Sequence, residues 1–154
     1  KYDNYLILAL LIVDQSDNYE YFSHKYKVSN NIKKRFKNIS TNYENIKSSN
    51  FFSEKNIKKL VYFLNKEYVL DLLLFSICIN KKINISSVKK LIEYVNVCVK
   101  PKFPISGDFL KTYGYDSGKE LGKKLKSLED KWITNDFIID KKEVDKYLNK
   151  VSKS

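Results

Sequence analysis

The stretch of sequence that says most about the fold covers residues 103–125 and reads FPISGDFLKTYGYDSGKELGKKL. Ser106 can cap a short helix, and Gly114 would end that helix in the manner of a C-terminal glycine. Ser117 with Glu120 three residues later forms a capping box, so we expect a second helix to begin there. The stretch therefore predicts a helix-turn-helix-like arrangement.

The rest of the chain also has a helical pattern. Apolar residues recur at three- and four-residue spacing almost throughout, which predicts an all-α, multi-helix fold without strands. The segment from Tyr68 to Ile79 is nearly all apolar and predicts a central buried helix. Pro101 and Pro104 break any helix between them. We therefore expect a helical body at residues 1–100 and a helical tail subdomain at residues 101–154.

Two of the expected helices have caps that can be named in advance. Ser29 or Asn30 can cap a helix with apolar residues at positions 32, 36 and 39, and Ser86 or Ser87 can cap a later one. On the first of these helices the basic residues at positions 33, 34, 35 and 37 should lie mostly in water.

The charge balance is strongly basic. Lys and Arg together number 29 against 18 Asp and Glu, which gives a formal net charge of +11. Such a surplus favours polyanionic partners, of which nucleic acid is the commonest. The alternative is a coding bias, because the chain is rich in Lys, Asn, Ile, Tyr and Phe and holds a single arginine, Arg35. Both interpretations stay open at this point.

The start of the chain bears on its origin and location. The chain has no Met and begins with Lys1, so we interpret it as a fragment of a longer protein. The apolar run from Tyr5 to Val13 is shorter than the roughly 20 residues that a spanning helix needs. We expect a buried core helix there and no membrane partner. Cys78 and Cys98 lie far apart in apolar surroundings, which indicates core cysteines in a reducing cytoplasm.

No arrangement typical of a catalytic centre is present. The sequence lacks a Gly-rich phosphate loop, and a single histidine, His24, supports neither a Ser/His/Asp group nor a zinc site. Asp71 is an odd carboxylate inside an apolar run, and we explain it as a polar helix edge or as a buried salt bridge to a lysine. We predict no catalytic residue, no metal ligand and no cofactor in this chain.

A phosphate site is possible where the second helix begins. The first turn of a helix exposes backbone N–H groups and the positive end of the dipole, and Gly118 and Gly122 would not obstruct a close-approaching backbone. Equally, these glycines could let two helices pack closely while the lysines form a solvated face. The residues predicted to contact RNA are Ser106, Gly107, Lys111, Gly114, Ser117, Gly118, Lys119, Gly122, Lys123, Lys124 and Arg35.

These motifs resemble the C-terminal signature of class II tRNA nucleotidyltransferases and bacterial poly(A) polymerases. That signature consists of an (S/T)G-x-D-L helix, a glycine turn and a PG-x-x-(V/I/L)G step. The matching residues are Ile105 to Leu110, Tyr113 to Tyr115, Ser117 to Gly122 and Leu125, with weaker matches at residues 132–137, 6–12 and 26–30. Ser117 replaces the family's proline and Phe109 its leucine, and each keeps the expected role.

The resemblance implies a tRNA-binding body and tail from a bacterial CCA-adding enzyme. Its partners would be tRNA and its own N-terminal catalytic head, which uses Mg and takes CTP and ATP as substrates. The head's Gly-Ser loop and Asp-x-Asp pair are not seen in this sequence. The contacts to tRNA should recognise the shape of the RNA and not its sequence. The expected location of the protein is the cytoplasm. Two alternatives remain, the same region of a bacterial poly(A) polymerase and a helical protein–protein adaptor that is basic only through codon usage.

Overall fold

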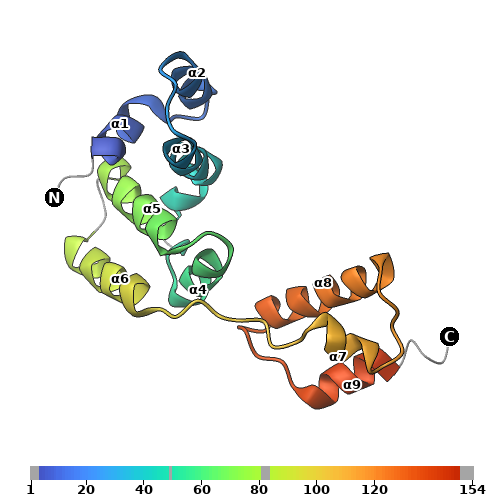
Figure 1. Ribbon diagram of the computed structural model, residues 1–154. Helices are drawn as coiled ribbons and strands as arrows, with labels where there is room; N and C mark the ends of the chain where they lie inside the picture. The colour runs from blue at the N-terminus through green and yellow to red at the C-terminus, as the bar shows by residue number, and fades with distance from the viewer. Residues whose placement is uncertain (1–3, 49, 81–83, 150–154) are drawn as a thin grey trace. The chain divides into compact units, whose positions relative to one another are not determined.

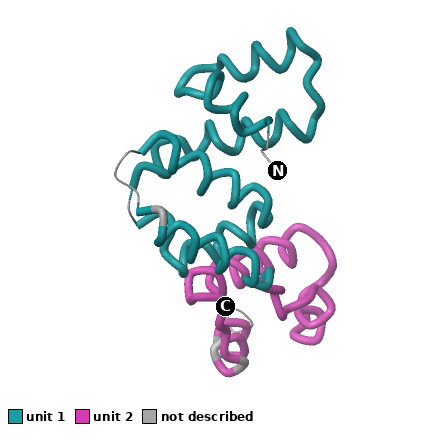
Figure 2. The backbone as a smooth tube through the Cα atoms, turned by 90° about the vertical axis from the view of Figure 1, so that its left-hand side faces the viewer, with its two compact units in different colours: residues 1–100 teal, residues 101–154 magenta. Residues whose placement is uncertain are grey.

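The computed structural model describes residues 4–48, 50–80 and 84–149. Over these residues the regular structure is helical and no strand occurs, which confirms the predicted all-α fold (Figure 1). The helices belong to two compact units, unit 1 at residues 1–100 and unit 2 at residues 101–154 (Figure 2).

Unit 1 is built around one central helix. Its elements are α1 (Asn4–Ile12), α2 (Asn18–Lys25), α3 (Asn30–Asn42), the 3-10 turn η1 (Asn45–Lys47), α4 (Glu54–Phe63), α5 (Lys66–Ile79) and α6 (Ile85–Val97). Helix α5 packs against α1, α3, α4, α6 and η1, as its central position in Figure 1 shows. Val69, Leu72 and Leu73 of α5 are fully buried. The prediction of a central buried helix is therefore confirmed.

The helix caps were predicted with mixed success. The Ser29 side chain accepts a hydrogen bond from the backbone N–H of Ile32 at 3.5 Å and begins α3, as expected. Helix α6 begins earlier than expected, because Asn84 is its cap and accepts from the Ser86 N–H at 2.9 Å. The prediction of Ser86 or Ser87 as the cap was wrong, since the Asn84 carbonyl already reaches a backbone donor two residues on.

Arg35 lies inside unit 1, and the prediction that it faces water was wrong. Its residue is only 8% exposed, and its Nε donates to Asp71 Oδ2 at 2.7 Å while Nη2 donates to Oδ1 at 2.6 Å. Position 35 borders the apolar face of α3 next to Phe36, and the long aliphatic stem of arginine can run across such a border. The partner of the odd carboxylate Asp71 is thus an arginine and not a lysine.

Helix α1 has a more exposed position than predicted. Ala9 is buried, but Leu11 is 78% exposed and Ile7 is 51% exposed. The helix packs on α2, α3 and α5 through its other side, so the prediction of a buried core helix holds for one face only. Among the described helices, none is long and apolar enough to cross a membrane.

The two cysteines have different surroundings. Both are free, and Cys98 is buried as predicted while Cys78 is exposed. Cys78 lies two residues after the buried Ser76, which places it about 200° around α5. The prediction of a core position was therefore wrong for Cys78.

Unit 2 contains α7 (Gly107–Lys111), α8 (Lys119–Thr134) and α9 (Lys141–Asn149). Its core consists of Leu110, Leu128, Val144 and Leu148, so each of the three helices contributes at least one fully buried side chain. An aromatic group adjoins this core through Phe103. The ring centroid of the single tryptophan, Trp132, lies 5.3 Å from that of Phe103 and 4.9 Å from that of Phe137.

Candidate nucleic-acid interface

The turn between α7 and α8 depends on two glycines with unusual backbone angles. Gly114 has a φ of 85° and Gly118 a φ of 143°, values that favour glycine over residues with a side chain. The N–H of Gly114 donates to the Lys111 carbonyl at 3.0 Å and closes the end of α7. Gly114 therefore ends α7 as predicted, and Gly118 turns the chain into α8.

Helix α8 begins without a side-chain cap. Its capping position is occupied by Gly118, which has no side chain with which to cap the first turn. The predicted capping box of Ser117 and Glu120 was wrong, because the turn at Gly118 starts the helix at Lys119 and leaves Ser117 outside it. The N–H of Gly122 donates to the Gly118 carbonyl at 3.1 Å. The three N–H groups before it have no earlier helical carbonyl to bond to, so they point out of the helix end.

A shallow cleft of about 370 Å³ lies at the N-terminal end of α8. Its lining residues form one continuous segment, from Tyr113 to Glu120. The hydroxyl of Tyr115 is buried and has no hydrogen-bond partner within the described residues. A buried hydroxyl of this kind is usually satisfied by water or by a bound group. The cleft thus offers backbone donors, while the Tyr115 hydroxyl is buried and is not exposed to it.

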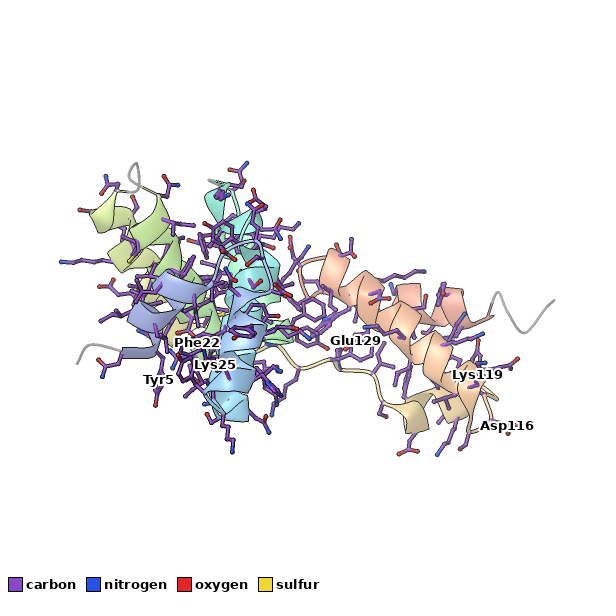
Figure 3. All side chains as sticks on the ribbon, turned by 90° about the horizontal axis from the view of Figure 1, so that it is seen from above. Tyr5, Phe22, Lys25, Asp116, Lys119 and Glu129 are labelled. Atoms are coloured by element: carbon purple, nitrogen blue, oxygen red, sulfur yellow. The ribbon has the colours of Figure 1, made fainter. Side chains whose placement is uncertain are left out.

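The charges around this cleft are mixed. Lys119 and Lys123 are exposed, but so are Asp116 and Glu120, and Figure 3 shows Asp116 and Lys119 at the same end of unit 2. The carboxylates offset part of the lysine charge. A phosphate at this place would be held mainly by the backbone N–H groups and the helix dipole, with the lysines adding attraction from its edges.

The glycines leave an open surface. A Cβ atom added at Gly118 or Gly122 would meet nothing within 4 Å. The alternative that these two glycines let helices pack closely was therefore wrong for the described structure. Gly107 differs, because its added Cβ would come to 3.4 Å from the Leu121 side chain, an ordinary packing contact between α7 and α8.

Several other predicted contact residues have structural partners. Ser106 accepts from the Phe109 N–H at 3.2 Å and caps α7 as predicted. Lys111 pairs with Asp108 at 2.9 Å on the surface, and the hydrogen bond from this lysine lowers the pKa of Asp108. The cleft brings together Gly114, Ser117, Gly118 and Lys119. Gly122 and Lys123 follow within the first two turns of α8.

Arg35 lies apart from this group, and Lys124 borders it through the cleft residue Tyr115, whose ring centroid is 5.9 Å from the Lys124 Nζ. Lys124 reaches α9, where its Nζ is 3.7 Å from the centroid of the Tyr147 ring. Arg35 belongs to unit 1 and bonds to Asp71 there. Arg35 is 8% exposed there, so little of its surface is open to a direct RNA contact.

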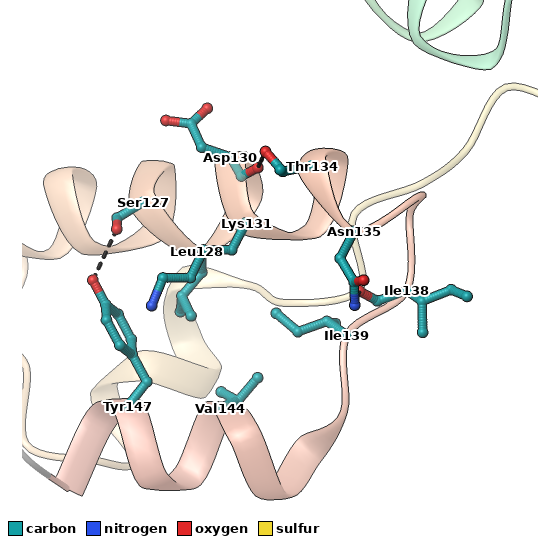
Figure 4. A pocket seen from close by; sticks show the side chains of 10 residues that line it. All are labelled: Ser127, Leu128, Asp130, Lys131, Thr134, Asn135, Ile138, Ile139, Val144 and Tyr147. Atoms are coloured by element: carbon teal, nitrogen blue, oxygen red, sulfur yellow. Dashed lines mark hydrogen bonds between the residues drawn. The ribbon is translucent and has the colours of Figure 1, made fainter. Parts of the chain in front are cut away.

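Sequence reasoning missed a second cluster on α8. Ser127 and Lys131 join Lys124 beside Tyr147 and border a larger cleft of about 820 Å³ between α8 and α9 (Figure 4). The available signal was the spacing of positions 124, 127 and 131, which lie on one face of a helix. Among the described residues no group of His, Cys, Asp and Glu side chains could hold a metal ion.

The fold and these clefts define an all-helical, basic protein whose exposed groups suit phosphate binding. No protein-family model matches the chain, and no solved structure matches it. A segment of 55 residues is 38% identical to a protein of Danio rerio named CCA tRNA nucleotidyltransferase 1, mitochondrial. The segment makes up 36% of this chain and 13% of that protein. The chain is thus similar, over one segment, to part of a CCA tRNA nucleotidyltransferase.

Proposed function

We propose that this chain is the tRNA-binding C-terminal part of a bacterial class II CCA-adding enzyme. It would position the acceptor end of tRNA for a separate catalytic head. The observation that supports this proposal most is the 38% identity over 55 residues to a CCA tRNA nucleotidyltransferase. The uncapped N-terminus of α8 supports it physically, since it offers backbone donors to phosphate.

The proposed mechanism is one of positioning. Backbone N–H groups at the start of α8 and the exposed Lys119 and Lys123 would hold phosphates of the tRNA backbone. Such contacts fix the orientation of duplex RNA without reading its sequence. The head would supply Mg and take CTP and ATP as substrates, and the whole enzyme would act in the cytoplasm.

A charge-matched pair of variants tests the proposed interface. Changing Lys119 and Lys123 together to Gln should weaken tRNA binding about tenfold or more. The slope of log affinity against log salt concentration should fall by about 2, one for each phosphate that a lysine no longer neutralises. The control changes the exposed lysines 33 and 34 of α3 to Gln, which alters the net charge equally. If both variants lose the same affinity, or neither loses any, the interface at α8 is refuted.

Two further measurements separate the alternatives. An adaptor that is basic only through codon usage should bind tRNA no better than an unstructured RNA of equal length. A full-length enzyme containing this chain should stop after three additions to tRNA that lacks CCA, whereas a poly(A) polymerase should continue. Preference for tRNA together with this arrest is the expected result.

A further inference from the structure

Two lysines of α8 meet at one tyrosine of α9. The Nζ atoms of Lys124 and Lys131 lie 3.7 and 3.3 Å from the centroid of the Tyr147 ring. The Ser127 hydroxyl, between them on the same face of α8, lies 2.8 Å from the Tyr147 hydroxyl, as the dashed line in Figure 4 shows. Two ammonium groups and two hydroxyls therefore lie together on this face.

No carboxylate within the described residues pairs with either of these lysines. The nearby acidic residues of α8 are used elsewhere, because Lys126 binds Glu129 at 3.0 Å and Asp130 at 3.2 Å. In Figure 4 the carboxylate of Asp130 points away from Tyr147. No carboxylate among the described side chains therefore offsets the positive charge at the cluster, a condition that favours an anion.

The phenol of Tyr147 responds to this charge. Its pKa is lowered, first by the Ser127 hydrogen bond and then by the positive charges of Lys124 and Lys131. Burial acts in the opposite direction and raises the pKa. The local environment therefore stabilises negative charge at the position where the four groups meet.

A cleft of mixed polarity adjoins the cluster. It has a volume of about 820 Å³, and Leu128, Val144 and Ile139 form an apolar part of its lining. Its polar lining residues include Lys131, Asn135 and the carboxylate Asp130. Leu128 and Val144 are buried core residues, which gives the cleft a firm apolar floor. In sites for small organic groups an apolar surface covers part of the ligand and nearby polar groups orient it, and this cleft offers both.

We propose that the cleft between α8 and α9 holds one unstacked nucleotide of a bound RNA. Its phosphate would bind Lys124 and Lys131 and accept the one hydrogen bond that the Ser127–Tyr147 hydroxyl pair has left to donate, while its base rests on Leu128 and Val144. A phosphate offers several charged acceptors and so suits converging donors, and an unstacked base has an apolar face to cover. Ser127 is about 12 Å along α8 from Lys119, so one RNA strand could reach both sites. This inference rests on the proposed function, namely that the chain binds RNA.

The test uses the whole 154-residue chain, labelled with the NMR-active nitrogen isotope ¹⁵N. The chain is titrated separately with AMP, adenosine, ribose 5-phosphate and inorganic phosphate. AMP should shift the backbone amide signals of Lys131, Asn135 and Tyr147. Because it carries both base and phosphate, AMP should bind at least about fivefold more tightly than ribose 5-phosphate or adenosine. If inorganic phosphate bound as tightly as AMP, the proposal that the cleft holds a base would be overturned.

Single substitutions then test the side chains. Lys131→Gln should weaken AMP binding about fivefold, and Lys131→Arg, which keeps the charge, should retain most of the affinity. The control Lys34→Gln removes an exposed lysine of α3 in unit 1 and should leave AMP binding unchanged. Equal loss in Lys34→Gln and Lys131→Gln would overturn the proposal.

A parallel titration with tRNA separates this inference from the proposed function. If tRNA binds, while AMP shifts no cleft signal and Lys131→Gln leaves tRNA affinity unchanged, the cleft proposal fails and the proposed function stands. If AMP binds in the cleft but tRNA does not bind at all, the proposed function fails and the ligand is a free nucleotide. If tRNA competes with AMP for the cleft, both are supported.

Discussion

Replacing Arg35 by Met should destabilise unit 1 by about 3–5 kcal/mol, the usual cost of leaving one member of a buried ion pair without its partner. The side chains of Arg35 and Asp71 are only 10% and 6% exposed, and two hydrogen bonds of 2.7 and 2.6 Å join them. The substitution removes both bonds and leaves the Asp71 carboxylate in an apolar frame.

A second acidic residue near Arg35 reduces the stability loss that we expect from substituting Asp71. Glu67 lies 3.8 Å from Nη1 of Arg35 but is 56% exposed, so water screens this contact and it contributes less than about 1 kcal/mol. Asp71→Asn keeps an oxygen acceptor and leaves Glu67 near the guanidinium. We therefore expect Asp71→Asn to lose about 2–3 kcal/mol, less than Arg35→Met.

The assay is urea unfolding followed by helical circular dichroism. Trp132, the single tryptophan, belongs to unit 2, so its fluorescence is an internal reference in the same samples. The control Lys34→Met changes an exposed residue of α3 and should alter the free energy of unfolding by no more than about 0.5 kcal/mol. A loss below about 1 kcal/mol in Arg35→Met, with an unchanged m-value, would refute the reasoning.

A double variant separates stability from binding. Arg35→Met with Asp71→Leu removes both charges and should regain most of the lost stability. Because Arg35 bonds to Asp71 inside unit 1, we expect this folded double variant to bind tRNA with unchanged affinity. A folded variant with clearly weaker binding would restore Arg35 as an RNA contact.

Three smaller predictions concern unit 2. Ser106→Ala should cost about 1 kcal/mol through loss of the α7 cap, measured by thermal unfolding, with Ser106→Thr as the milder control. Gly114→Ala should destabilise unit 2 by about 1 kcal/mol, because φ at this position is 85°. The matched change Gly122→Ala lies inside α8, where the added Cβ meets nothing within 4 Å, and should stabilise unit 2 by about 0.5–1 kcal/mol. Equal effects of the two substitutions on the free energy of unfolding would contradict this prediction. Lys131→Gln should raise the lowered pKa of Tyr147, which carbon NMR of labelled tyrosine can follow. Since the folded-state pKa is depressed, the stabilisation from Tyr147 is lost as pH falls through that pKa, and a smaller pH dependence is expected in the variant.

The features that sequence predicted well are local ones. Ser106 bonds to a backbone N–H three residues on, and Gly114 ends α7 through its own backbone angle. Such features depend on neighbouring residues alone, so a motif is enough to find them. The predicted start of α8 was wrong for a related reason. Gly118, with a φ of 143°, became the capping residue in place of Ser117. A capping-box motif contains no information about that angle.

The features that sequence missed depend on distant partners. Arg35 and Asp71 are 36 residues apart in the chain, and the helical pattern of α3 placed Arg35 on the polar side. Tyr147 is 20 residues from Ser127, so nothing in α8 alone indicates that its lysines meet an aromatic ring. Only the packing of α8 and α9 in unit 2 brings these groups together.

The arrangement of the lysines bears on the question that composition left open. A coding bias raises the number of lysines but does not choose their neighbours, and Lys126 illustrates the ordinary outcome, with two carboxylates at three- and four-residue spacing. Lys124 and Lys131 differ, because both approach one tyrosine and neither pairs with a carboxylate among the described residues. Two like charges held close together repel each other, so an anion between them would relieve a cost that the fold itself imposes. The salt dependence of tRNA binding in Lys131→Gln and Lys126→Gln therefore separates the two origins of the lysine content. If the lysines were selected for phosphate binding, the slope of log affinity against log salt concentration should be smaller in Lys131→Gln alone. If they result from codon usage, the two variants should have equal slopes.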